Sequence, residues 1–167
     1  MHVRAHPNGR VIVTPVDFSS LAVDADDEQT AMRAAIARVT DTLRKLSGSV
    51  RARFADPVVA ELDSCTVEAF GQNGTPPVRI TVALVVAVRE THEGTFYVVA
   101  APEVDHAYIA STSREAARKQ AQKAILEAFP HWGPNAVLSC DDVGESRLEL
   151  VEVPFPPPAE KIGRAHV

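Results

Sequence analysis

Two stretches of this chain carry the same order of sequence signals, and a shift of 86 residues takes one onto the other. In each, a glycine-containing turn is followed by a strand, a proline, a short apolar strand, a capping residue and an amphipathic helix. The shift takes Asp26 to Thr112. It superposes apolar helical positions: Ala31 on Ala117, Ala35 on Ala121, Val39 on Ile125 and Leu43 on Phe129. Any two amphipathic helices can be aligned on their stripes, but the shared order upstream favours an internal duplication.

Each copy contains local signals for a β-hairpin and a helix. Asn8-Gly9 suits a tight turn between two short strands, and Asp26 with Gln29 predicts the start of the first helix. Thr112 with Glu115 forms a capping box for the second helix. Residues 78–88 alternate as one long strand, with bulky side chains on one face. The other face carries Ala83, Val85 and Ala87 between Arg79 and Arg89.

These signals predict an α+β fold, with one antiparallel sheet built from two β-hairpin–strand–helix halves and both helices on one face. We expect a first repeat at residues 1–48, a connector at 49–77, and a second repeat with a closing strand at 78–155. Within the connector, residues 58–62 are interpreted as a helical turn. Residues 147–155 alternate as the closing strand.

Composition limits the class of protein. Hydrophobic residues make up 46% and charged residues 23% of the 167 residues, which excludes a disordered chain and allows one full core. The longest apolar run is too short to span a bilayer, and the first residues lack the apolar core of a signal peptide. We therefore expect a cytoplasmic protein without membrane contact, in which Cys65 and Cys140 are independent thiols.

The C-terminal residues have a composition of their own. Residues 156–160 are a proline-rich linker, which usually leads to a further domain. Residues 161–167 resemble one reading frame of a sequencing adapter. We interpret them as an artefact, and the chain as the N-terminal part of a longer protein.

Sequence motifs for catalysis are missing. The chain has no phosphate-binding Gly-x-x-x-x-Gly-Lys loop, no dinucleotide turn, no Gly-x-Ser-x-Gly elbow and no zinc ligand pair. We therefore assign no catalytic, cofactor or metal residues. Cys140 with a nearby histidine such as His131 remains as an alternative enzyme hypothesis. The acidic segment 131–160 argues against nucleic acid, although the second helix carries Arg114, Arg118, Lys119 and Lys123.

The second repeat resembles a known small fold. A strand ending in Ala101-Pro102, a short strand at 107–110, Thr112-Ser113-Arg114-Glu115-Ala116 and Ala124-Ile125 are similar to the HicB-like domain, a β-β-β-α fold of the partial RNase H-like type. The family's Leu-Pro-Gly-Cys turn is replaced by Glu103-Val104-Asp105-His106. The resemblance implies an antitoxin that binds a small toxin, nucleic acid or both.

The layout of the whole chain also resembles the N-terminal regions of bacterial Clp-type AAA+ ATPases, with paired strand-and-helix units, a closing strand at 148–153 and a linker. This resemblance implies a substrate- or partner-docking module.

The leading functional hypothesis is a non-catalytic protein-interaction module of a larger protein. Its partner-binding residues are predicted to be Arg79, Val85, Arg89, Arg114 and Arg118. Docking on the flat face of the long strand or on a strand edge is expected, and a sheet edge or a downstream domain would support oligomers. The HicB-type antitoxin and the enzyme that uses Cys140 are the alternatives.

Overall fold

The computed structural model describes residues 1–52, 54, 59–69, 78–104, 107–128 and 145–154. It contains strands, a 3-10 helix and α-helices in the following order: β1 His2–Ala5, β2 Val11–Thr14, η1 Val16–Leu21, β3 Val23–Ala25, α1 Glu28–Lys45, α2 Gly48–Ala52, β4 Val59–Ala69, β5 Val78–Thr91, β6 Gly94–Ala100, β7 Tyr108–Ser111, α3 Arg114–Ala128 and β8 Ser146–Leu148.

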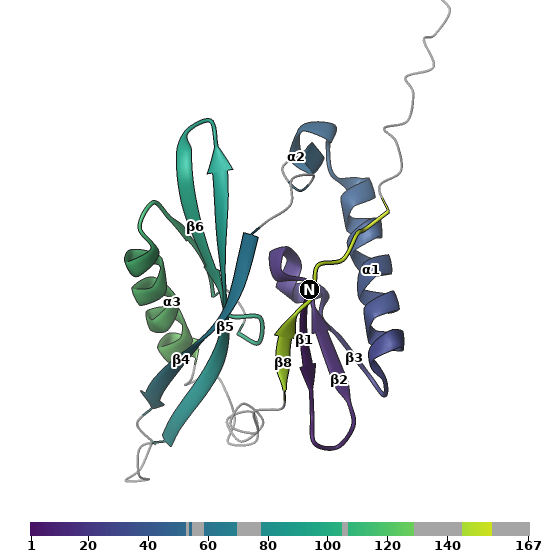
Figure 1. Cartoon of the computed structure of the whole chain (residues 1–167), viewed down its shortest axis with the longest axis horizontal. Helices are drawn as coiled ribbons and strands as arrows, with labels where there is room; N and C mark the ends of the chain where they lie inside the picture. The colour runs from purple at the N-terminus through teal and green to yellow at the C-terminus, as the bar shows by residue number, and fades with distance from the viewer. Residues whose placement is uncertain (53, 55–58, 70–77, 105–106, 129–144, 155–167) are drawn as a thin grey trace, which may run out of the picture.

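The strands form two antiparallel sheets, which confirms the α+β class (Figure 1). The first sheet, which we call sheet A, has the strand order β3-β2-β1-β8, and sheet B has the order β4-β5-β6-β7. The prediction of a single sheet with both helices on one face is wrong. Each helix covers its own sheet, and α1 and α3 lie on the outer sides of the molecule (Figure 1).

Sheet A and α1 form the smaller core. Val3 and Val13 are opposite one another on β1 and β2, and both pack against Ala31 and Ala35 of α1. Small alanine side chains let the helix approach the sheet closely. The helix begins one residue later than predicted, because Asp27 rather than Asp26 accepts a hydrogen bond from the backbone N–H of Thr30, at 2.8 Å.

Sheet B and α3 form the larger core. Ile80, Val82, Leu84 and Val86 alternate along β5 on the side that faces α3, which confirms the predicted bulky face. They pack with Val99 of β6 and with buried side chains of α3: Ala117, Ala121 and Ile125. The helix starts after Ser113, whose Oγ accepts from the N–H of Ala116 at 3.3 Å, and not after Thr112 as predicted.

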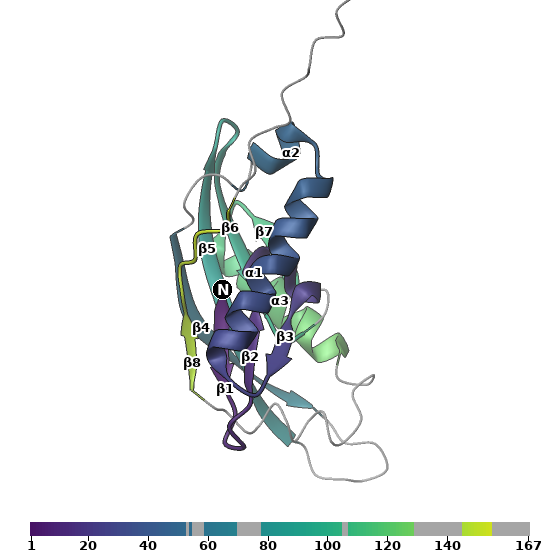
Figure 2. The ribbon, with the colours of Figure 1, turned by 90° about the vertical axis from the view of Figure 1, so that its right-hand side faces the viewer.

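The inner faces of the two sheets bury each other. Figure 2 shows β8 and β4 along one rim of the molecule, and these strands are in contact. Val85 and Ala87 on the inner face of β5 are 0% and 3% exposed. Arg4 of β1 reaches across to pair with Glu103, and Arg89 of β5 pairs with Asp17 of η1. The flat side of β5 is therefore not the open face that we predicted, because the first half of the chain covers it.

The connector holds more structure than the sequence indicated. Residues 59–62, interpreted as part of a helical turn, belong to β4, which pairs with β5 over its whole length. The closing strand is also different: within the described residues 145–154, only Ser146–Leu148 form a strand, and they extend sheet A by pairing with β1. The proposed linker and adapter segments, 156–160 and 161–167, lie outside the described residues. None of the described helices combines the length and apolar character that crossing a bilayer requires.

The contact between Arg4 and Glu103 yields a test of the inter-sheet interface. Their side chains are only 6% and 13% exposed, so replacing Glu103 by alanine removes the carboxylate that a buried guanidinium faces. We expect the free energy of unfolding to fall by about 3 kcal/mol in urea denaturation. The double replacement Arg4→Met with Glu103→Leu should recover most of that loss, because the apolar pair leaves no charge buried.

The control for this prediction is the exposed pair of Arg44 and Asp41 on α1. Replacing Asp41 by alanine should change the free energy of unfolding by about 0.5 kcal/mol or less. Equal losses for Glu103→Ala and Asp41→Ala would contradict a buried inter-sheet ion pair.

We expect the stability of the fold to depend on pH because His2 is buried. Its side chain is buried, its Nε2 lies 3.3 Å from Oγ of Ser146, and burial lowers the pKa of the imidazole despite the opposing influence of Glu103. The unfolded chain therefore binds a proton more readily than the folded one. The stability that neutral His2 contributes is fully present above the unfolded pKa of about 6.5 and is lost as the pH falls below it.

Urea denaturation at about pH 7.5 and about pH 5 measures this effect. In the variant His2→Gln, the drop in the free energy of unfolding between these pH values should be smaller than in the wild type. The replacement His92→Gln is the control, because His92 is exposed on the β5–β6 turn and should leave the pH dependence unchanged. An unchanged pH dependence in His2→Gln would show that His2 is not the group responsible.

Candidate functional site

Two of the predicted site residues, Arg114 and Arg118, lie together at the start of α3. They are four positions apart, so they project from the same side of the helix. Arg114 pairs with Glu61 and Arg118 with Asp63, two acidic residues on the helix-facing side of β4. Two ion pairs therefore connect the edge strand β4 to α3.

The structure does not bring the other three predicted residues to this place. Arg79 is exposed near the start of β5, where its Nε lies 3.7 Å from Oε1 of Glu68 on β4. Val85 lies in the interior between the sheets, and Arg89 is bonded to Asp17 there. Val85 and Arg89 therefore stabilise the interface between the sheets, and neither is presented to a partner in this conformation.

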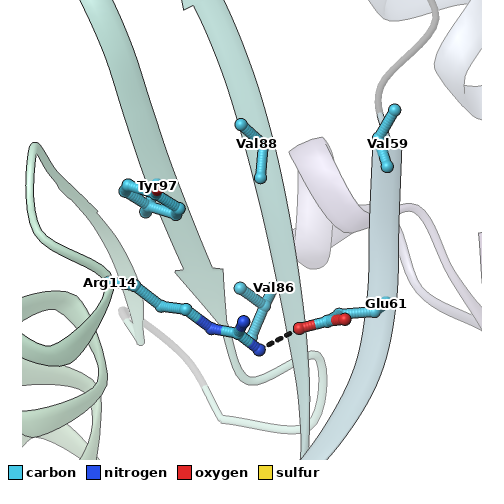
Figure 3. Close-up of a pocket in the computed structure, with 6 residues that line it drawn as sticks. All are labelled: Val59, Glu61, Val86, Val88, Tyr97 and Arg114. Carbon is cyan, nitrogen blue, oxygen red and sulfur yellow. Dashed lines mark hydrogen bonds and ion pairs between the residues drawn. The ribbon is translucent and has the colours of Figure 1, made fainter.

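A small hollow lies beside the start of α3, where β5 and β6 extend beyond the helix (Figure 3). Its volume is about 110 Å³. The ion pair of Arg114 and Glu61 closes one end of it (Figure 3). Its remaining lining is formed by an aromatic and three aliphatic side chains: Val59, Val86, Val88 and Tyr97.

The hollow adjoins the β4 edge of sheet B. β4 is the outermost strand of that sheet, and within the described residues only β5 pairs with it. Val59 is 77% exposed, although an aliphatic side chain at the end of a sheet gains nothing from contact with water. The candidate site therefore consists of the outer edge of β4 together with the hollow, and we call it the β4 edge site.

Sequence reasoning missed most of the β4 edge site. Val59, Glu61 and Tyr97 were not among the predicted residues. One signal was available: Val59, Glu61, Asp63, Cys65 and Val67 occupy every second position, which is typical of one face of a strand. Asp56-Pro57 immediately upstream hid this pattern, because the pair is a strong breaker signal.

One thiol, that of Cys65, lies close to the β4 edge site. Cys65 lies on the helix-facing side of β4, and burial raises the pKa of its thiol. A raised pKa keeps the thiol protonated at neutral pH, whereas a nucleophilic cysteine needs the thiolate. Among the described residues there is no group of three or more His, Cys, Asp or Glu side chains that would hold a metal ion. Cys140 and His131 lie outside the described residues.

A second surface lies along α1. It is a shallow depression with a volume of about 580 Å³. Among the described residues, only side chains of α1 line it: Glu28, Gln29, Met32, Arg33 and Ile36. Because no second element provides an opposing wall, this surface has fewer convergent groups than the β4 edge site.

Comparisons with known proteins do not assign the chain to a family. No protein-family model matches it, and neither the curated proteins nor the solved structures contain a significant match.

Proposed function

We propose that this chain is a non-catalytic protein-docking module whose β4 edge site binds an extended segment of a partner protein. The observation that carries the proposal is the outer edge of β4, an 11-residue strand that, within the described residues, pairs with β5 alone and touches β8 without pairing with it. An unpaired strand edge offers a row of backbone N–H and C=O groups, and the natural occupant of such a row is another extended chain.

The hollow supports a side-chain pocket for that segment. Pockets for small ligands and cofactors usually enclose about 300 to 1,000 Å³, which is well above the volume beside Val59. A space of this size suits one aliphatic side chain. In strand addition, backbone hydrogen bonds supply affinity, and pockets for alternate side chains supply specificity.

The charges around α3 favour a protein partner over nucleic acid. The four cations of the predicted basic stripe each have an acidic neighbour: Arg114 has Glu61, Arg118 has Asp63, Lys119 has Glu115, and Lys123 has Glu127. Phosphate binding would have to compete with these carboxylates. The proposal thus follows the docking role that the Clp-type layout implies, and the charges count against the nucleic-acid role of a HicB-type antitoxin.

A single replacement at the exposed end of β4 tests this proposal. Val59→Asp places a charge at the mouth of the hollow, and the fold should tolerate it because the native side chain is mostly in water. The probe is a set of synthetic peptides of about seven residues with alternating valine and threonine, which favour extended conformations. We expect the wild type to bind them with amide shifts confined to β4 and the hollow, and Val59→Asp to weaken binding about five-fold or more, measured by NMR titration.

The matched control is Leu126→Asp, on α3 away from the hollow, where the side chain is 38% exposed. It should bind the peptides like the wild type. Peptide binding that is equal in Val59→Asp and the wild type, amide shifts elsewhere, or no binding would overturn the proposal. Concentration-dependent dimers that disappear in Val59→Asp would also overturn it, since the occupant would then be a second copy of the chain.

A further inference from the structure

From β2 onward, the two halves correspond position by position in the folded structure. A shift of 86 takes Asp27, which caps α1, to Ser113, which caps α3. It takes the first helical residue Glu28 to Arg114. The helix positions that face the sheets also match, and all are buried: Ala31 with Ala117, Ala35 with Ala121, and Val39 with Ile125.

The central strands of the two sheets match as well. Val3 lies opposite Val13 in sheet A, and Val86 lies opposite Val99 in sheet B. All four side chains are buried under the helix of their own sheet. The same shift of 86 takes Val13 to Val99, so Val3 and Val86 hold equivalent places, and β1 corresponds to the end of β5.

The outermost strands β4 and β8 are equivalent to each other, but they lie in opposite sheets. On its other side Val3 is opposite Arg147 of β8, and Val86 is opposite Glu61 of β4. The shift of 86 takes residue 61 to residue 147, so β4 and β8 are equivalent strands in the same register. Yet β4 follows α1 and lies in sheet B, while β8 follows α3 and lies in sheet A. We call residues 1–69 the first unit and residues 78–154 the second unit. Each unit's last strand lies in the other unit's sheet.

The charges at the two junctions are opposite in sign. At the start of α3, Arg114 pairs with Glu61 of β4, and at the equivalent point of α1, Glu28 pairs with Arg147 of β8. If each strand returned to its own unit, Glu61 would meet Glu28 and Arg147 would meet Arg114. Like charges at such positions destabilise a pairing by about as much as opposite charges stabilise it.

A second contact of β4 favours the same arrangement. Asp63 pairs with Arg118 in sheet B. The shift of 86 relates Arg118 to Met32, so Asp63 would lose its guanidinium partner if β4 lay in sheet A.

We propose that the two units are joined by reciprocal strand exchange, and that the inverted ion pairs direct each strand to its sheet. β1, with Glu28 of α1 nearby, pairs with a strand that carries a cation, which is β8 with Arg147. β5, with Arg114 of α3 nearby, pairs with a strand that carries an anion, which is β4 with Glu61. This inference concerns the inner edges of the outermost strands and is independent of what binds the outer edge of β4.

The test uses sign reversals in the full chain. E61R places a second cation beside Arg114, and R147E places a second anion beside Glu28. Each should lower the folding equilibrium constant about two- to five-fold, because these pairs are roughly half exposed. The combination E61R/R114E should restore it, and E28R/R147E should restore most of it, since Arg147 also pairs with Glu149. In the combination E61R/R147E, each strand instead matches its own unit's helix, and the preference for exchange should fall about ten-fold or more.

Strand neighbours are read from cross-strand NOEs. In the wild type we expect NOEs from β1 to β8 and from β5 to β4, and in E61R/R147E a loss of these or the appearance of NOEs from β1 to β4. The quadruple variant E28R/E61R/R114E/R147E restores all the pairs, so it should fold and exchange like the wild type even if E61R/R147E does not fold. The sign swap D41R/R44D, in an ion pair within α1, is the control and should leave all NOEs unchanged.

Three results would overturn the proposal. The first is a wild type in which β1 pairs with β4. The second is a pair of combinations, E61R/R114E and E28R/R147E, that are no more stable than their single variants. The third is an E61R/R147E variant with the stability and NOEs of the wild type, which would show that charge does not direct the strands.

Discussion

The burial of two sheet faces against each other is the constraint on which the rest of this structure depends. Each sheet is covered by a single helix on its outer side, so its inner face must be buried by the other sheet. The two inner faces differ in character. Sheet B contributes small apolar side chains such as Val85 and Ala87, whereas sheet A contributes His2 and Arg4, which are buried polar residues. The pairs of Arg4 with Glu103 and of Arg89 with Asp17 make this mixed interface possible, because they compensate the charges that it encloses.

This arrangement decides which surfaces remain for a partner. Because the inner face of β5 is covered, the accessible backbone of sheet B lies at its rim. β4 forms that rim, and two of its acidic side chains, Glu61 and Asp63, lie on the side facing α3 and pair there with Arg114 and Arg118. Charged side chains commonly protect a strand edge from pairing, but a carboxylate that is bound to a helix protects the edge less. The ion pairs of β4 therefore stabilise the sheet and, in our proposal, leave its edge accessible.

The exchanged strands link the two halves of the chain through backbone pairing as well as through side-chain packing. Two units that merely packed against each other would separate along their interface. Here β4 is paired with β5 along its full length, and β8 is paired with β1, so neither sheet is complete without a strand from the other half. The two strands differ in extent, since the backbone bonding of β8 reaches only from Glu145 to Glu149, opposite Met1 to Ala5. We infer that sheet A is the more easily opened of the two.

The sequence by itself determined the two long helices, the hairpins and the α+β class. Alanines at helical spacing and alternating valines in β5 are local patterns, so one sequence is enough to find them. Local patterns also set the limit of precision: Asp26 and Asp27 are both good caps, as are Thr112 and Ser113, and only the hydrogen bonds distinguish them. The partners of Glu61, Asp63 and Arg147 are far away in sequence, as is the face that covers Val85. Tertiary structure alone decided that there are two sheets, that β4 and β8 close them, and that Arg114 and Arg118 face a strand, because periodicity defines the two sides of an element but not what packs against each side.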